Sequence, residues 1–452
     1  MSNPMGDDRA CSEAIQRWFD AEPLWGRALA ALRASGSSVY LVGGSVRDAL
    51  RGHPGDDMDV AVQGSAIQLG RWLADRLGGA FYPMDREHDV ARIVFPCDAY
   101  YHIDLAGLRG RTILQDLAAR DFTINAMGVS LNDDLGILLD PTGGRADLAA
   151  RVLRMAYADA LRDDPARLLR ALRLGAALGL ELDPETCAQI QAQASLLEAV
   201  SPERIRDEFL AMLTLPTAEP ILQALDLGLL PQIVPALSHE QALAGIRWLE
   251  ALHREGLDGG VVAPYQAGVR EAWRRSPVDG RQRGALVALA ALLADVTTGA
   301  LAGLGARLRL SGREWGHVRG VLACLQADIW TEGAQGLTRV AAHRYYRRYG
   351  EAGVDGAVLA ACRPGAVLGV GRRAAYLLWA WFEAHSEIIE PPRLLQGHDL
   401  LREFGLEPGP RIGQILDALG EAQVEGRVRT GAQARVYVRE ILTTERSKGS
   451  RV

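Results

Sequence analysis

The first part of the chain alternates between runs typical of strands and the spacing typical of amphipathic helices. Val39 to Val42 is a β-branched and aromatic run, which predicts a buried strand. A glycine pair interrupts it, and a brief helix is expected from Ser45 to Leu50. In Asp57 to Val62, acidic or small residues alternate with apolar ones, which predicts a second strand. Ser65 to Leu77 has helical spacing and ends at another pair of glycines.

More strand patterns follow, and helical spacing dominates after them. The further strands and the segment expected to close the sheet are Ala80–Pro83, Asp89–Phe95, Tyr100–Leu105, Ile124–Leu131 and Leu138–Gly144. A short helix is expected around Leu114 and Leu117, and a longer helical stretch from Ala146 to Leu178, broken near Pro165. No strand pattern is found beyond Ser201. The pattern predicts an α+β protein with a mixed β-sheet and helices at the N-terminal end and an all-α remainder.

The glycine pair and the strand after it hold the candidate chemistry. Because side chains alternate along a strand, Asp57 and Asp59 share one face with Ala61, and the apolar residues between them face the other way. Glycines between a strand and the polar start of a helix let backbone N–H groups approach an anion, as in phosphate-binding turns. Two carboxylates on one face form a hard-oxygen site suited to Mg²⁺.

The spacing of these features resembles that of a known superfamily. A strand, Gly-Gly, about a dozen residues and then Asp-x-Asp is similar to the DNA polymerase β-like nucleotidyltransferases. The fuller string GGSVRD…DMD resembles the class II tRNA nucleotidyltransferases and bacterial poly(A) polymerases. The alternative is an ordinary strand–turn–strand with two solvent-facing aspartates, which the string Val46 to Asp48 disfavours. The resemblance implies that Asp57 and Asp59 are catalytic and bind the metal. It also implies that the triphosphate is bound by Gly43, Gly44 and Arg47.

Two further features extend the resemblance. RDFTINA, from Arg120 to Ala126, matches the family's second motif. This implies that Arg120 contacts the triphosphate and that Asp121 and Asn125 lie near the ribose or shape the turn. In the alternative interpretation Asp121 and Asn125 are only turn formers. Asp104, between two apolar residues, has the flanking of the family's third catalytic carboxylate, or else it is a strand-end residue.

An acidic residue followed three positions later by arginine resembles the family's nucleotide-selecting motif. Here these residues are Asp164 and Arg167, and Arg170 and Arg173 follow at the same spacing. A carboxylate that accepts from a base's amino group, with a guanidinium that donates to its ring nitrogen, fits cytosine and adenine and opposes uracil and guanine. The competing interpretation is a helix that starts at Asp-Pro and has arginines on its surface.

The C-terminal part adds a moderate similarity and one ambiguous cluster. Leu394 to Leu416 resembles the family's tail motif. Residues 344–349 interleave arginines and tyrosines, which suits contact with RNA or, equally, a helix with its tyrosines packed inward. By resemblance the chain divides into a helical lead-in (1–36), a catalytic nucleotidyltransferase head (37–145), a nucleotide-selecting helical neck (146–215), a helical body (216–385) and a tRNA-binding helical tail (386–452).

Composition limits the class of protein and the compartment in which it is expected. With 452 residues, 48% hydrophobic and 23% charged, the chain is an ordinary soluble globular protein that is long enough for several domains. A net charge of −6 argues against uniform coating of nucleic acid but allows a local basic track. The five cysteines lie far apart, without metal-ligand spacing, so a reducing cytoplasmic setting and no zinc are expected. No apolar run is long enough to span a bilayer, so no membrane is expected.

These features imply a template-independent enzyme that adds CMP from CTP to the 3′ end of tRNA with Mg²⁺ as cofactor. Between Asp104 and Leu117 the chain is short of the extended flexible segment found in relatives that add all of CCA. In this it resembles members that add only two cytidines. The alternatives are a full CCA-adding enzyme, which also uses ATP, and a poly(A) polymerase or A-adding enzyme. A different class is an inactive RNA-binding protein, which has no use for the carboxylate pair.

Overall fold

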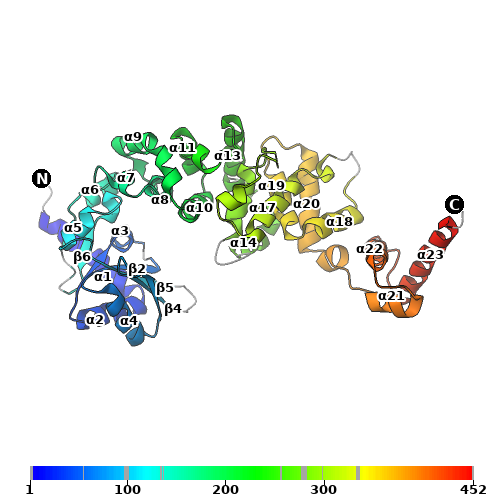
Figure 1. The fold of residues 1–452 in the computed structure, drawn as a ribbon, viewed down its shortest axis with the longest axis horizontal. Coiled ribbons are helices and arrows are strands. Elements are labelled where there is room, and N and C mark those ends of the chain that lie inside the picture. Colours follow the sequence, from blue (N-terminus) through cyan, green and yellow to red (C-terminus); the bar gives the residue numbers. More distant parts are fainter. Residues whose placement is uncertain are drawn as a thin grey trace. The chain divides into compact units, whose positions relative to one another are not determined.

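The computed structural model describes residues 4–53, 55–95, 101–132, 135, 137–254, 257–275, 282–297, 299–331 and 336–449. The chain forms two compact units. Unit 1 is Met1–Glu208 with Asp226–Gln232, and unit 2 is Phe209–Leu225 with Ile233–Val452. Figure 1 colours unit 1 from blue to green and most of unit 2 from green to red.

Unit 1 contains a seven-stranded mixed sheet in the order β3-β4-β5-β2-β1-β6-β7. The central neighbours β2 and β5 run parallel, and the other neighbours run antiparallel. The strands are β1 Ser38–Val42, β2 Asp57–Gln63, β3 Ala80–Asp85, β4 Val90–Phe95, β5 Tyr101–Gly107, β6 Gly128–Ser130 and β7 Leu138–Leu139. A separate parallel pair is formed by β8 Val152–Leu153 and β9 Glu181–Leu182.

Helices pack on this sheet and continue after it. Those up to residue 213 are α1 Pro4–Asp20, α2 Pro23–Ala34, α3 Gly44–Leu50, α4 Ala66–Leu77, α5 Ile113–Ala118, α6 Gly144–Ala150, α7 Ala160–Asp163, α8 Arg167–Leu178, α9 Pro184–Ala192 and α10 Pro202–Leu213, with the 3-10 turns η1 Thr123–Asn125 and η2 Ala194–Ala199. The start of α4 is fixed by Asp89, whose carboxylate accepts from the N–H groups of Ala66 and Ile67. Such capping satisfies backbone donors that the helix itself leaves free.

The main core of unit 1 lies on one face of the sheet. Met58, Val60 and Val62 of β2 are buried there together with apolar residues of α1, α2 and α4. A smaller cluster on the other face joins Ala61 to Leu117 of α5, so α5 covers that face beside β1 and β2. The alternation expected for β2 is therefore confirmed, and it leaves the aspartates on the face opposite the main core.

One expected strand of the head is wrong. Ile124 to Leu131 does not form a single strand, because η1 occupies the first part and β6 covers only Gly128–Ser130. The N–H of Asn125 donates to the carbonyl of Phe122 at 2.9 Å, which closes a tight turn. The turn brings the Asn125 side chain to Arg47, so a long-range polar contact overrides the apolar pattern of this segment.

The stretch from Ala146 to Leu178 is less helical than expected. The break near Pro165 is confirmed, since α7 ends at Asp163 and α8 begins at Arg167. The pair β8–β9 also interrupts the region, so the expectation of an all-α neck is wrong in this detail. The α+β class, with a mixed sheet first and a largely helical remainder, is confirmed.

From α11 onward, the described residues are helical or irregular and include no strand. The helices are α11 Glu219–Asp226, α12 Leu230–Ile233, α13 His239–Arg254, α14 Gln266–Arg274, α15 Arg283–Leu292, α16 Leu304–Arg307, α17 Gly312–Leu325, α18 Arg339–Tyr349, α19 Glu351–Ala361, α20 Leu368–Phe382, α21 Gly397–Phe404, α22 Pro410–Val424 and α23 Gly431–Gly449, with the 3-10 turns η3 Ala263–Tyr265 and η4 Asp328–Trp330 and the π-helix η5 His385–Ile389. The last three helices share an apolar cluster of their own around Leu400, Ile415 and Leu419. Within the described residues, no helix is both long and apolar enough to cross a bilayer.

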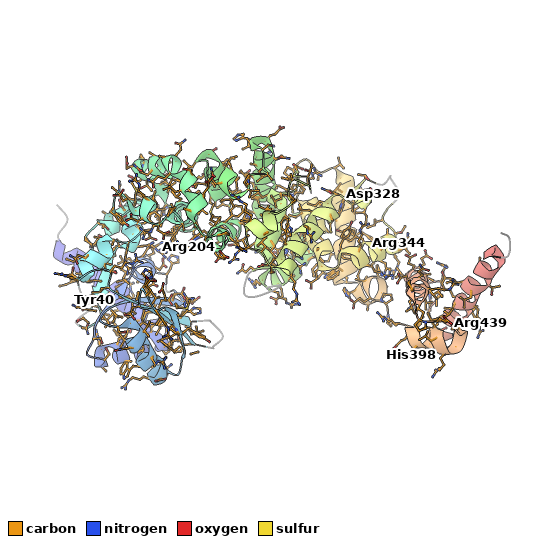
Figure 2. The ribbon with its side chains drawn as sticks, viewed as in Figure 1. Tyr40, Arg204, Asp328, Arg344, His398 and Arg439 are labelled. Atoms are coloured by element: carbon orange, nitrogen blue, oxygen red, sulfur yellow. The ribbon has the colours of Figure 1, made fainter. Side chains whose placement is uncertain are left out.

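In the arginine–tyrosine cluster of α18, two tyrosines pack inward and the arginines lie at the surface. Tyr345 and Tyr346 are buried, and their hydroxyls donate to backbone carbonyls of α19 and α20. Arg344, labelled in Figure 2, and Arg347 form ion pairs with carboxylates of α22. These side chains therefore join helices within unit 2. The division of the chain into lead-in, head, neck, body and tail stays a prediction.

Candidate active site

The glycine turn between β1 and α3 lies directly against the candidate site. Gly43 has φ +67°, a backbone conformation that other residues rarely adopt. A Cβ atom at Gly43 would lie 3.0 Å from Nη1 of Arg120 and 3.3 Å from Oδ2 of Asp59. At Gly44 a Cβ atom would also lie 3.3 Å from that Asp59 oxygen. Only glycine allows the backbone to approach both a carboxylate and a guanidinium so closely.

Three candidate carboxylates share the sheet face opposite the main core. Asp57 and Asp59 are alternate residues of β2, and Asp59 is the direct partner of Asp104 in the parallel β5. Burial raises the pKa of Asp59, and the negative charges of Asp104 and Asp57 raise it further. The positive charges of Arg120 and Arg47 act in the opposite direction. This is a site at which a bound cation relieves repulsion among like charges.

Two of these carboxylates have cationic or imidazole partners that the sequence did not single out. Arg92 of β4 donates to both oxygens of Asp104, from Nε and Nη2, each at 2.7 Å. His102 of β5 places Nδ1 3.0 Å from Oδ1 of Asp57. The only available signal was strand register, because Arg92 is the direct partner of Asp104 and His102 that of Asp57.

The donor set fits Mg²⁺ by its chemistry. Mg²⁺ is a hard cation that is usually bound through one or two carboxylates, with water and substrate phosphates completing its shell. Asp57 and Asp59 supply such a pair on one face. Within the described residues, no three His, Cys, Asp or Glu side chains gather closely enough to hold a metal ion by themselves. The carboxylate pair therefore suits a metal shared with a substrate.

Ser45, the second residue of α3, fixes the strand that bears the aspartates. Its buried hydroxyl accepts from the N–H of Asp59 at 2.8 Å and donates to the carbonyl of Asp57 at 3.1 Å. The helix that starts at the glycine turn is thereby joined to the backbone of β2 beside both carboxylates. Sequence reasoning missed this residue, since a serine near a helix start is ordinarily a cap.

A chain of polar contacts runs from the glycine turn to α8. Arg47 donates from Nη1 to Oδ1 of Asn125 at 2.7 Å, and Nδ2 of Asn125 donates to Oδ1 of Asp121 at 3.1 Å. Asp121 forms an ion pair with Arg170 of α8 at 2.9 Å. The structure thus brings together four of the residues predicted from the resemblance. Arg120, beside the glycine turn, is held by the buried carboxylate of Asp116 at 2.9 Å.

The predicted base-selecting pair lies at the start of α8. Arg167 Nε is 3.7 Å from Oδ2 of Asp164, and its Nη1 donates to the carbonyl of Ala160 at 3.1 Å. Arg204 of α10, labelled in Figure 2, donates to the same Asp164 oxygen at 2.8 Å. Burial raises the pKa of Asp164, but the hydrogen bond and charge of Arg204, with the charge of Arg167, bring the pKa below its ordinary value. The Asp164 carboxylate is therefore held ionised. Arg173 instead pairs with Glu208 at 2.5 Å.

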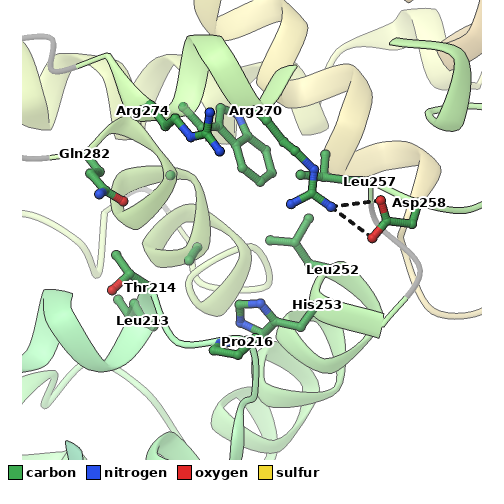
Figure 3. A pocket seen from close by; sticks show the side chains of 13 residues that line it. Leu213, Thr214, Pro216, Leu252, His253, Leu257, Asp258, Arg270, Arg274 and Gln282 are labelled. Carbon is green, nitrogen blue, oxygen red and sulfur yellow. Dashed lines mark hydrogen bonds and ion pairs between the residues drawn. The ribbon is translucent and has the colours of Figure 1, made fainter. Parts of the chain in front are cut away.

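A separate cavity lies within unit 2 (Figure 3). It has a volume of about 270 Å³ and is lined by residues that include His253, Trp273 and Arg274. Among the described lining residues the one carboxylate is Asp258, and both of its oxygens accept from Arg270. The described lining of the cavity thus has no pair of carboxylates like that on β2.

The sheet with its glycine turn defines a nucleotidyltransferase head, a class that the family models support. Family models agree along the chain. The Poly A polymerase head domain matches residues 39–154, the probable RNA and SrmB-binding site of polymerase A matches 179–240, and the putative tRNA nucleotidyltransferase domain 2 matches 387–435.

Full-length relatives place the chain more narrowly. It is 35% identical to a CC-adding tRNA nucleotidyltransferase of Geobacter sulfurreducens, over 94% of this chain and 97% of that one. It is 32% identical to an A-adding tRNA nucleotidyltransferase of Deinococcus radiodurans, over 88% and 94%. The chain belongs to the class II tRNA nucleotidyltransferase and poly(A) polymerase family. A Thermotoga maritima CCA-adding enzyme complexed with tRNA shares its fold, with a TM-score of 0.64 and 22% identity over 91% of this chain and 92% of that one.

Replacing Ser45 by Ala should lower the free energy of unfolding by about 1–3 kcal/mol, because a buried N–H and a carbonyl of β2 lose their partner. Urea denaturation of the full chain followed by circular dichroism measures the change. Ser38→Ala, at an exposed position of β1, is the matched control and should leave stability unchanged. Equal stability of the two variants would show that the Ser45 hydroxyl does not hold β2.

Proposed function

We propose that this protein adds CMP from CTP to the 3′ hydroxyl of tRNA, building the CC of the tRNA end and releasing pyrophosphate. The main support is the connection between β5 and α5. Only residues 108–112 separate Gly107 from Ile113. The N–H of Leu108 donates to the carbonyl of Val62 at 3.1 Å, and that of Arg109 donates to Oδ1 of Asp116 at 2.9 Å.

A short, pinned connection favours a site of one size. The full CCA-adding relatives that the sequence resembles have an extended segment at this place. A base pocket that must change size between C and A needs such a movable part. This chain holds the corresponding residues by hydrogen bonds to β2 and α5. Sequence identity alone does not decide the product, since CC-adding and A-adding relatives are 35% and 32% identical to this chain.

The phosphate end of the site is formed by backbone and arginines. The N–H of Gly43 donates to the carbonyl of Met127 at 3.2 Å, so Gly43 would line the triphosphate and the backbone at Gly44 would donate to it. Arg47 and Arg120, whose guanidinium groups are oriented by Asp48 and Asp116, would supply positive charge and further donors to the phosphate oxygens. Asp57 and Asp59 would hold Mg²⁺, with Asp104 beside them. When bound, Mg²⁺ polarises phosphoryl oxygens and favours ionisation of the attacking hydroxyl. The chain's own contribution is positioning and fixed charge.

The base end is formed by the pair at the start of α8. Cytosine presents an amino donor beside a ring-nitrogen acceptor, and uracil presents the reverse. The Asp164 carboxylate would accept from the amino group and Arg167 would donate to the ring nitrogen. Uracil in the same place would leave both groups without a partner, which costs binding free energy. The ion pair with Arg204 supports this proposal, because it keeps Asp164 charged and in place.

The product assay uses tRNA that lacks its 3′ CCA, Mg²⁺ and one labelled nucleotide at a time. We expect two CMP residues from CTP and no AMP on a tRNA that ends in CC. CMP addition together with one AMP on that tRNA would replace the proposal by full CCA addition, and one AMP without any CMP would replace it by A addition. A lengthening A tail would indicate poly(A) polymerase activity. RNA binding without any incorporation would indicate the inactive RNA-binding class.

Asp59→Ala should lower the rate of CMP addition by roughly 10³-fold or more, because the face loses one of its two metal-binding carboxylates. Single-turnover incorporation with saturating CTP measures the rate. Asp75→Ala, an exposed carboxylate on α4, is the matched control and should retain full activity. Activity of the Asp59 variant equal to the control would refute the metal assignment.

Arg167→Ala should lower the preference for CTP over UTP at least ~10-fold, because the donor to the ring nitrogen is lost. The ratio of kcat/KM for the two nucleotides gives the preference. Arg162→Ala removes an exposed arginine of α7 and should leave the ratio unchanged. Because Arg167 is buried, Arg167→Lys and a thermal melt accompany the test, and an unchanged ratio in a folded variant would remove Arg167 from base selection.

A cytoplasmic setting is part of the same proposal. The cysteines lie far apart along the sequence without metal-ligand spacing, which suits a reducing compartment.

A further inference from the structure

The sheet face that bears the carboxylates continues past them to the edge of the sheet. In the pairing register, Asp59 is opposite Asp104, Asp104 is opposite Arg92, and Arg92 is opposite Tyr82 of β3. Directly opposed residues of neighbouring strands point to the same face. Tyr82 and Arg92 therefore stand in one row with the carboxylates, on the side away from the glycine turn.

This part of the face is open in unit 1. Helix α4 packs against the opposite face of β3 and β4, where a Cβ on Gly70 would touch Phe81 and Ala91. Tyr82 is 50% exposed, and no hydrogen bond of its hydroxyl is found within the described residues. The Arg92 side chain is 41% exposed, and its fork is turned toward Asp104. An aromatic ring and a cation thus lie unburied beside the carboxylates.

The two sides of the carboxylates are chemically different. On the β1 side lie the glycine turn, Arg47 and Arg120, which suit a triphosphate. On the β3 side lie Arg92 and Tyr82, which suit a nucleic-acid strand, because an arginine attracts phosphate and a tyrosine ring stacks on a base. In-line transfer needs the attacking hydroxyl and the pyrophosphate on opposite sides of the reacting phosphorus. The acceptor strand therefore approaches from the β3 side.

We propose that Tyr82 is a stacking seat for one of the last two bases at the 3′ end of the acceptor RNA, with Arg92 beside it. This inference rests on the proposed function. Neighbouring strands lie about 4.8 Å apart, so Tyr82 is roughly 10 Å along the row from Asp104. That separation is the reach of one or two nucleotides from the reacting hydroxyl. Arg92 is also a positioning residue, since it holds both oxygens of Asp104.

Stacking of an RNA base on Tyr82 is tested by crosslinking and by steady-state kinetics. Truncated tRNA with a 5-iodopyrimidine at its last or penultimate position crosslinks under long-wavelength light to an aromatic side chain stacked on that base. In the full-length protein without added nucleotide, the crosslink is expected in the tryptic peptide Leu77–Arg86 and should be lost in Tyr82→Ala. Trp72→Ala is the matched control, because Trp72 is an exposed aromatic residue of α4. A crosslink that persists in Tyr82→Ala would overturn the seat.

The kinetic expectation separates stacking from a structural role. Tyr82→Ala should raise the KM for tRNA about 5- to 100-fold and leave the KM for CTP unchanged, and Tyr82→Phe should restore the KM for tRNA because the ring is retained. Equal KM values for tRNA in wild type and Tyr82→Ala would contradict the proposal. A crosslink at Tyr82 in a wild-type protein that incorporates no CMP would refute the proposed function and support the seat as an RNA-binding site.

Discussion

The structure of the head depends on holding three carboxylates on one face of a sheet. Asp57, Asp59 and Asp104 repel one another, and the raised pKa of Asp59 reports that repulsion together with burial. The face remains stable because its back is a packed apolar core, which fixes β2 and β5 in register. Arg120, beside the glycine turn, and Arg92, on β4, offset the negative charge of these carboxylates without burying them.

The two ends of the proposed nucleotide site are physically joined in unit 1. The contacts from Arg47 through Asn125 and Asp121 reach Arg170 on α8, the helix that begins with Arg167. A shift of α8 would therefore be transmitted to the glycine turn. Residues that are far apart in the sequence are held in fixed relation by this hydrogen-bonded path.

The sequence was sufficient wherever the chemistry is local. The glycine turn, the alternation of β2 and the partners Asp164 and Arg167 each lie within a few residues, so pattern and resemblance found them. Contacts across strands were missed, because nothing in the neighbouring sequence pairs Arg92 with Asp104 or shows Ser45 binding β2. The strand expected from Ile124 was too long, because its first residues form a turn closed by the N–H of Asn125 on the carbonyl of Phe122 and only Gly128–Ser130 pairs as β6. Domain limits depend on long-range packing and stay predictions.

The ion pair between Arg92 and Asp104 affects how a polyanion such as RNA approaches this face of the sheet. The chain has a net charge of −6, and a bare cluster of acidic groups would add a barrier to diffusional encounter with RNA. In the resting protein Arg92 cancels the outermost acidic charge of the row on the β3 side. The charge on that side of the row is therefore smaller than three unpaired carboxylates would give, which lowers the local repulsion of a polyanion.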